Sequence, residues 1–239
     1  MKIIKASAEL MQKNINLEPI EFGGRISHRS EADTADEKRM NFIQRNVIEH
    51  GDWSIVEHVS VSVLATMDRG CTHEWVRHRL MSYTQESTRF VNYEKKMPPS
   101  FIYPIVGVEC NQCLLKNEPL RYPDGWFHET TPQAKCVYDR TWLEHMGYSE
   151  SAYKRLLEKK WRPQEARSIL PNALASKIMT TANLRSWRHL LLMRTTKEAH
   201  PQIKEICINL LGQFKEAVPL LFDDIEPESR QIDNMRKPH

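Results

Sequence analysis

The feature that most constrains the fold of this chain is the order of the segments in which apolar residues recur at a regular spacing. Residues 59–67 alternate between apolar and polar side chains, with Val61, Val63 and Ala65 on one side, as in a half-buried strand. Residues 36–50 and 201–218 instead carry apolar side chains at helical spacing. Helices and strands follow one another without the regular strand–helix–strand alternation of a parallel sheet. The sequence therefore predicts an α+β fold.

Caps and chain breakers define the shorter segments. Thr72 is a candidate N-cap for a helix, and Gly147 separates two expected helices. In chain order we expect helices over residues 72–81, 132–145, 149–161 and 163–169, a strand over 177–182, a helix over 186–194 and a polar tail after Pro227. Residues 101–127 carry several prolines and are expected to be irregular.

Composition argues against several classes of function. The 34 Lys and Arg residues nearly balance the 31 Asp and Glu residues, and a formal charge of +3 does not indicate a general nucleic-acid coat or a membrane-surface protein. Residues 1–14 lack the apolar run of a secretory signal, and no stretch approaches the roughly 20 apolar residues of a membrane span. We therefore expect a cytoplasmic protein. The five cysteines are an odd number, and reduced thiols are expected.

The chain has no glycine-rich phosphate loop. Only eight glycines are present, and neither GxGxxG nor GxxxxGK[ST] occurs. The densest polar stretch is instead residues 77–89, RHRLMSYTQESTR, which holds three arginines, a histidine, two serines and a glutamine. Any nucleotide bound by this chain must therefore be held in another way.

Residues 77–89 predict a site for an anionic, nucleotide-like ligand. Arginine forks bind phosphate bidentately, hydroxyls and backbone amides complete such sites, and Gln85 can read the edge of a base. Composition alone equally allows a solvated helix face with paired charges, because runs of charge are usually on the surface.

The same stretch resembles the signature R-H-R-x-x-S-x-N-x-x-S-x-R of the flavin-dependent thymidylate synthases. Six positions match: Arg77, His78, Arg79, Ser82, Ser87 and Arg89. Thr84 stands where the signature has Asn, so any contact carried by that amide is lost.

Further blocks extend the resemblance. Residues 50–58 resemble the family's H-G-x-x-[ST]-x-x-E-H, and residues 165–171 resemble its E-x-A-R-x-x-L-P. The blocks cover roughly residues 25–214 in order, except for 95–160, which varies in the family. The resemblance implies a synthase domain over residues 1–225 with a variable insertion at about 95–160, followed by a polar tail over 226–239.

The resemblance also implies an architecture and a chemistry. The family fold is a single α+β domain, a twisted mixed sheet flanked by helices, and it forms a homotetramer with active sites shared between subunits. Its members methylate dUMP to dTMP, with methylenetetrahydrofolate as carbon donor and FAD, reduced by NADPH, as hydride source. Cofactors carry such chemistry while the protein orients and polarises. No cysteine nucleophile is needed.

Roles for individual residues follow from the resemblance alone. Arg194 matches the catalytic arginine that sits against the uracil ring and favours its anionic form. The residues implied to bind FAD are Ser54, Arg77, His78, Arg79, Gln85, Asn183, Arg185 and His189. Those implied to bind dUMP are Glu74, Arg77, Gln85, Glu86, Ser87, Thr88, Arg89, Arg167 and Arg194, with Arg89 and Arg167 at the phosphate. No metal is implied.

Two other readings of the residues stay open. Cys110 and Cys113, with His128 and Cys136 nearby, could form a zinc or redox module, although the spacing fits no familiar zinc finger. Residues 77–89 could instead bind nucleic acid, since Tyr83 and Phe90 are interleaved with the basic residues. The near-neutral total charge argues against that second reading, so we expect neither nucleic acid nor membrane as a partner.

Overall fold

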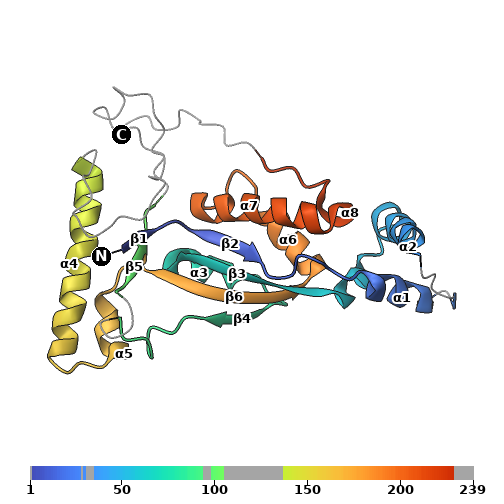
Figure 1. Cartoon of the computed structure of the whole chain (residues 1–239). Helices are drawn as coiled ribbons and strands as arrows, with labels where there is room; N and C mark the ends of the chain where they lie inside the picture. The colour runs from blue at the N-terminus through green and yellow to red at the C-terminus, as the bar shows by residue number, and fades with distance from the viewer. Residues whose placement is uncertain (1, 28, 31–34, 94–97, 105–136, 229–239) are drawn as a thin grey trace. The chain divides into compact units, whose positions relative to one another are not determined.

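The computed structural model describes residues 2–27, 29–30, 35–93, 98–104 and 137–228, coloured along the chain in Figure 1. Contacts divide the chain into two units. The first unit holds residues 1–7, 66–75 and 85–178, and the second holds residues 8–65, 76–84 and 179–239.

Helices and strands are intermixed along the chain, which confirms the predicted α+β class. In chain order the elements are β1 (Lys2–Ile4), β2 (Ser7–Leu10), α1 (Glu18–Ser27), α2 (Asp36–Ile43), the π-helix η1 (Gln44–Glu49), the 3-10 helix η2 (Trp53–His58), β3 (Ser60–Asp68), α3 (Arg69–Trp75), β4 (Ser82–Gln85), β5 (Ser100–Ile102), α4 (Val137–Glu158), α5 (Pro163–Ala166), the 3-10 helix η4 (Arg167–Ile169), β6 (Ala175–Asn183), α6 (Leu184–Arg194), α7 (Pro201–Ala217) and α8 (Pro219–Phe222). The larger sheet has the strand order β2-β3-β6-β4, and β1 pairs with β5 in parallel.

Strand β3 follows the predicted alternation. Val61, Val63, Ala65 and Met67 are all buried, whereas Ser60 is exposed. The predicted strand over residues 177–182 is likewise confirmed as the interior of β6. A period of two puts alternate side chains on opposite faces, so each pattern could be read without knowledge of the partner strands.

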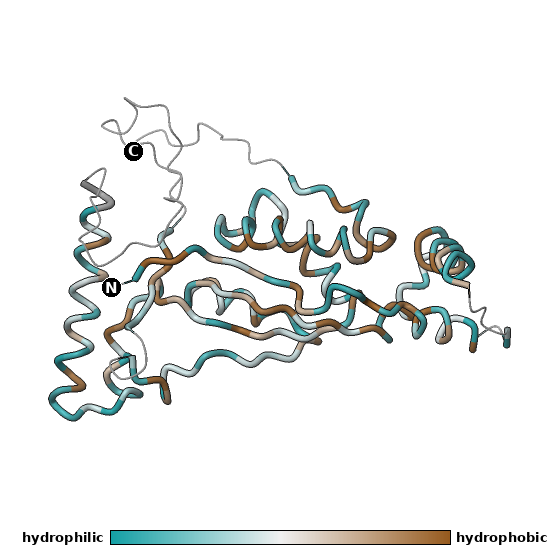
Figure 2. The backbone as a smooth tube through the Cα atoms, viewed as in Figure 1, coloured by the Kyte–Doolittle hydropathy of each residue, from teal (hydrophilic) through white to brown (hydrophobic). Residues whose placement is uncertain are grey.

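Aromatic side chains hold α6 and α7 in the second unit. The indole Nε1 of Trp187, in α6, donates to the carbonyl of Val61 at 3.1 Å. The Trp187 and Phe214 rings lie 5.8 Å apart, and Phe214 lies 4.7 Å from Phe222. Figure 2 shows the apolar residues recurring along α7. The five residues predicted to form its apolar face are all buried: Ile203, Ile206, Leu210, Leu211 and Phe214.

The helix predicted over residues 36–50 changes its hydrogen bonding part-way. Residues of α2 are α-helical, and η1 continues as a π-helix. At that point the buried Asn46 side chain donates to the carbonyl of Phe42 at 2.8 Å. Gly51, at a φ of +81°, ends the segment as predicted, because glycine adopts this left-handed conformation without steric penalty.

In the first unit, α4 corrects the prediction of two helices separated by Gly147. The helix runs unbroken from Val137 to Glu158 and passes through Gly147. Met146, Tyr153 and Leu157 bury one face of it in a cluster that includes Phe101. This packing outweighs the roughly 1 kcal/mol by which an interior glycine disfavours a helix relative to alanine.

Helix α3 corrects a second prediction, since it spans Arg69–Trp75 rather than residues 72–81. The carboxylate of Asp68 accepts from the backbone N–H of Cys71 at 2.7 Å, so Asp68 takes the capping part predicted for Thr72. The Thr72 hydroxyl instead donates to the carbonyl of Arg69 at 2.9 Å.

The other helical predictions are confirmed or fall outside the description. Short helices begin at Pro163 and Leu184, close to the predicted starts. Cys110, Cys113, His128 and Cys136 lie outside the described residues, as do Pro132 and most of the polar tail.

Candidate active site

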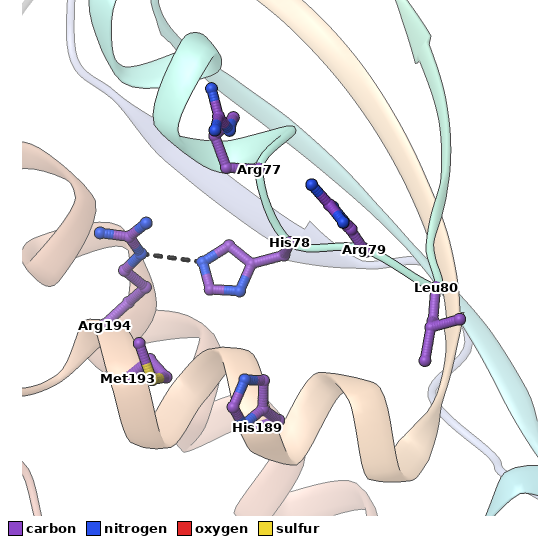
Figure 3. A pocket seen from close by; sticks show the side chains of 7 residues that line it. All are labelled: Arg77, His78, Arg79, Leu80, His189, Met193 and Arg194. Atoms are coloured by element: carbon purple, nitrogen blue, oxygen red, sulfur yellow. Dashed lines mark hydrogen bonds between the residues drawn. The ribbon is translucent and has the colours of Figure 1, made fainter.

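The second unit contains a hollow of about 400 Å³ with a strongly basic lining. Its walls come from the bend after α3 and from the last two turns of α6 (Figure 3). The lining residues are Arg77, His78, Arg79, Leu80, His189, Met193 and Arg194. No carboxylate is among them, so the hollow suits an anionic or electron-rich ligand.

A strained bend presents the basic residues. Leu80 has a φ of +65°, a genuine outlier for a bulky side chain, and is 86% exposed. The Tyr83 hydroxyl donates to the backbone carbonyl of His78 and braces the bend. Strain of this kind persists where surrounding contacts over-determine the backbone, and it is concentrated at functional sites.

Helix α6 forms the opposite wall. The Asn183 side chain caps this helix by accepting from the backbone N–H of Ser186 at 2.8 Å. Trp187, Leu190 and Leu191 are fully buried, and this inner face anchors the helix. His189 and Met193 are four residues apart and therefore share the face that lines the hollow.

His78 and Arg194 meet in the hollow. The Nε of Arg194 donates to Nε2 of His78 at 2.8 Å, although the two residues are 116 positions apart in sequence (Figure 3). Nε2 can accept only while the imidazole is neutral, with its proton on Nδ1. The His78 contact therefore fixes one edge of the Arg194 guanidinium. Because the guanidinium is planar, holding this edge also orients the rest of the group.

The protonation of His78 agrees with this geometry. Burial, together with the nearby positive charges of Arg194 and His189, lowers the pKa of His78 from 6.5 to about 4. The His78 and His189 rings lie edge-to-face at 6.4 Å. His78 is thus a neutral acceptor near pH 7 and leaves the positive charge of the hollow to its arginines.

A second group of predicted residues lies in the first unit. The Nη1 of Arg167, in η4, donates to the hydroxyl of the buried Thr88 at 2.9 Å. Arg89 follows directly, and its backbone N–H donates to the Ser87 hydroxyl at 3.3 Å. The structure therefore brings Arg167 to the turn formed by residues 87–89, as a phosphate site would require.

Gln85 and Glu86 hold that turn in place. The amide of Gln85 donates to the hydroxyls of Thr72 and Ser176, both at 3.0 Å. The Glu86 backbone N–H donates to the carbonyl of Lys177 at 2.8 Å, and its carboxylate accepts from the Tyr93 hydroxyl at 3.2 Å. Both residues therefore have structural roles in addition to any contact with a ligand.

The remaining predicted residues lie outside the hollow. Ser54 is exposed in η2, Glu74 is half-buried in α3, and Asn183 caps α6. Arg185 is exposed and forms an ion pair with Glu57. None of these four residues lines the hollow.

Two lining residues, Leu80 and Met193, were not predicted. Leu80 occupies an unspecified position of the signature, and only its backbone conformation reveals its place in the site. Met193 could have been found from sequence, because it lies four residues after His189 on the same helical face.

The comparisons identify the family. A family profile described as thymidylate synthase complementing protein matches residues 9–220. A flavin-dependent thymidylate synthase of Mycolicibacterium vanbaalenii is 31% identical over 213 residues, which cover 87% of this chain and 78% of that protein. The chain belongs to the flavin-dependent thymidylate synthase family.

Other members of this family match over a similar range. Flavin-dependent thymidylate synthases of Mycobacterium bovis and Mycobacterium tuberculosis are each 31% identical over 212 residues, covering 87% of this chain and 78% of theirs. The family predicted from the signature at residues 77–89 is thereby confirmed, and with it an enzyme.

The thiols in the described part of this family member are inert. Cys71 and Cys207 are both buried, and neither is in a disulfide. Burial raises the pKa of Cys207 to about 12, and burial together with Asp68 raises the pKa of Cys71 still further. Neither forms a thiolate near neutral pH, which is the form that acts as nucleophile or metal ligand.

The described residues form neither a metal site nor a membrane span. They contain no group of three or more His, Cys, Asp or Glu side chains placed to hold a metal ion. No helix in the same part of the chain has the length and apolar character needed to cross a membrane.

Proposed function

We propose that this chain methylates dUMP to dTMP, with methylenetetrahydrofolate as the carbon donor and FAD, reduced by NADPH, as the hydride source. The observation that carries the proposal is the Arg194–His78 contact, in a basic hollow lined by the family signature. It fixes a guanidinium beside the residues that the family resemblance assigns to flavin and substrate.

The donor set of the hollow fits FAD. Its lining offers arginine forks and imidazoles and contains no carboxylate, so it is compatible with a pyrophosphate and with the electron-rich edge of a flavin. When bound, FAD supplies the hydride that completes the methyl group. The residues proposed to hold it are Ser54, Arg77, His78, Arg79, Gln85, Asn183, Arg185 and His189.

Arg194 is proposed to act on the uracil ring. The ring must gain negative charge before its carbon can attack the methylene donor, and a guanidinium placed against the ring stabilises that charge. Nε is held by His78, and the positive charge of the planar guanidinium is what we assign to the ring. The orientation is set before substrate arrives, which is the condition for strong electrostatic stabilisation.

The dUMP phosphate is assigned to the turn formed by residues 87–89. Arg167 already donates to Thr88, and a phosphate would add a charged acceptor between Arg167 and Arg89. Glu74, Arg77, Gln85, Glu86 and Ser87 complete the proposed dUMP set. We further propose one synthase domain over residues 1–225, and a homotetramer in which subunits share active sites.

No protein nucleophile takes part in the proposed reaction. Since the thiols of Cys71 and Cys207 are protonated and buried, neither can attack the uracil ring. Single replacement of each of the five cysteines by alanine is therefore expected to leave dTMP formation intact. Complete loss of turnover in a folded single variant would contradict this mechanism.

The proposal is tested on the purified protein. We expect a yellow protein with a flavin absorption spectrum, and dTMP formation that requires dUMP, methylenetetrahydrofolate and NADPH together. Arg77→Ala is expected to weaken flavin or dUMP binding by about 10-fold to 100-fold, because a charged hydrogen bond contributes roughly 1.5–3 kcal/mol. Unchanged titrations of both ligands would remove the hollow from the proposed function.

A further inference from the structure

Residues 219–228, called the C-terminal strap here, are fastened to α6 in the second unit. Arg188, in α6, donates through Nη1 to the carbonyl of Leu221 and to the carboxylate of Asp224, both at 2.6 Å. Phe222 and Ile225 are buried. The strap therefore packs as part of the unit's core and is tied to the helix that carries Arg194.

The strap ends at the turn that follows Arg194. The backbone N–H of Glu228 donates to the carbonyl of Thr195 at 3.1 Å. Its side-chain carboxylate accepts from the backbone N–H of Lys197 at 3.0 Å. Its carbonyl accepts from Nζ of Lys204, in α7, at 2.7 Å. Glu228 thus joins the end of α6, the connecting turn and α7 with its three hydrogen-bonding groups.

The side chain of Glu228 is exposed, but two of its hydrogen-bonding partners belong to buried residues. Thr195 is buried and caps α6 by donating its hydroxyl to the carbonyl of Leu191 at 2.8 Å, so its own carbonyl is held in a fixed direction. Lys204 is also buried, and its ammonium group is directed to Glu228. Buried charges require partners, which makes the contact at Lys204 specific rather than incidental.

We propose that Glu228 is a positioning residue for Arg194. It binds the turn at Thr195 and at Lys197, ties it to α7 through Lys204, and so keeps the end of α6 in the place where the Arg194 guanidinium meets His78. The arginine itself is the last residue of α6, where helices fray when their ends are not held. The consequence for methylation rests on the proposed function, whereas the consequence for the Arg194–His78 contact does not.

The primary test compares Glu228→Ala with the matched control Glu226→Ala. Glu226 is an exposed acid of the same strap and lies 3.6 Å from Lys215 at the surface. E228A removes the side-chain bond to Lys197 and keeps the two bonds made by the Glu228 backbone. In single-turnover experiments it is therefore expected to lower dTMP formation by about 10-fold, less than the roughly 100-fold cost of a catalytic group misplaced by about 1 Å. Flavin reduction by NADPH, dUMP affinity and flavin content are expected to stay near wild type. E226A is expected to leave all of these unchanged.

A second readout does not depend on turnover. The positive charge of Arg194 helps to lower the pKa of His78, so an NMR titration of the His78 ring reports whether the arginine is in place. E228A is expected to raise that pKa in the direction shown by Arg194→Ala, and E226A to leave it unchanged. Glu228→Gln keeps an acceptor for Lys197 and is expected to restore most of both properties.

Two chain lengths give an independent comparison. Ending the chain after residue 232 keeps Glu228, whereas ending it after residue 226 removes all three of its hydrogen bonds. The shorter chain is expected to show the E228A defects more strongly, and Lys204→Met to reproduce them with the full-length chain. If E228A and K204M have the same His78 pKa and the same rate of dTMP formation as the control E226A, Glu228 does not position Arg194. Absence of dTMP formation in the wild type would overturn the proposed function, but the titration would still decide the role of Glu228.

Discussion

At the scale of single residues, the neutral His78 determines what Arg194 can do. A protonated imidazole would repel the guanidinium and could not accept from it. Because the His78 pKa is about 4, the contact is available throughout the range in which enzymes of nucleotide synthesis work. Arg194 is thereby fixed by a group that does not neutralise it, as a carboxylate would.

We expect Arg194→Ala to lower methylation by about 10²–10³, the loss typical when one charge-stabilising donor is removed. Interactions that strengthen in the transition state raise turnover more than binding, so flavin content and flavin reduction are expected to persist. Arg194→Lys is expected to restore only part of the rate, since a point charge does not reproduce the planar fork. Flavin reduction and dTMP formation are measured separately in single-turnover experiments. Equal losses in the two steps would exclude the assigned role.

The depressed pKa of His78 also predicts a pH dependence of stability. An unfolded histidine titrates near 6.5 and the folded one near 4, so between these values the unfolded state binds more protons. The stabilisation is fully present above pH 6.5 and is lost as the pH falls toward 4. Between pH 7 and pH 5 we expect His78 to account for a loss of about 1–2 kcal/mol in the free energy of unfolding.

The measurement is urea unfolding of wild type and His78→Gln at several pH values. The variant has no group at this position that titrates, so the difference between the two free energies should shrink from pH 7 to pH 5. Parallel curves across that window would show that His78 is not held neutral in the folded protein.

At the scale of elements, two glycines have room for a β-carbon but differ in backbone conformation. Their replacement by alanine therefore separates the effect of conformation on stability from the effect of packing. Gly147 lies inside α4, and a β-carbon placed there would meet no atom within 4 Å. Gly147→Ala is therefore expected to raise the free energy of unfolding by about 0.5–1 kcal/mol. Gly51 is equally open, but its φ is +81°. There the same substitution is expected to lower stability by about 1–2 kcal/mol.

Urea midpoints of both variants, taken at one protein concentration, test this pair. Opposite signs are expected from one chemical change in two sites of similar openness. If Gly147→Ala destabilises the protein, the unbroken helix over Val137–Glu158 would be wrong and the two-helix prediction would regain support.

At the scale of the whole molecule, the predicted site residues fall into two groups. Arg194 lines the basic hollow of the second unit, and Arg167 contacts Thr88 in the first. We place Arg89 in the same group as Arg167, because Arg89 directly follows Thr88, which Arg167 contacts. A site shared between subunits would therefore draw Arg89 and Arg167 from the same chain.

Subunit mixing tests this arrangement. Arg167→Ala mixed with Arg194→Ala is expected to regain activity, with about a quarter of the sites intact after random exchange if each site takes the two arginines from different chains. Arg89→Ala mixed with Arg167→Ala is expected to stay inactive, since each such site would lack one of the pair. Failure of the first mixture despite verified exchange would favour a site contained in one chain.

The sequence by itself determined the elements whose signal is local. Two patterns predict which face of their element is buried: the alternation that ends at Met67 and the helical spacing from Ile203 to Phe214. These predictions are possible from sequence because an apolar face is buried whichever element packs against it. The signature at residues 77–89 likewise located the basic bend, because phosphate-binding chemistry requires those side chains wherever the chain places them.

Tertiary structure decided what depends on contacts between distant residues. Gly147 lies inside a continuous helix because Met146 and Tyr153 pack into one core, a gain that exceeds the local preference of glycine. His78 is neutral because folding buries it beside Arg194, 116 residues away, and no sequence pattern records the dielectric or the charge that surrounds a side chain. The elements follow from periodicity, whereas the orientation of the arginine assigned to catalysis follows only from the packing that brings two remote segments together.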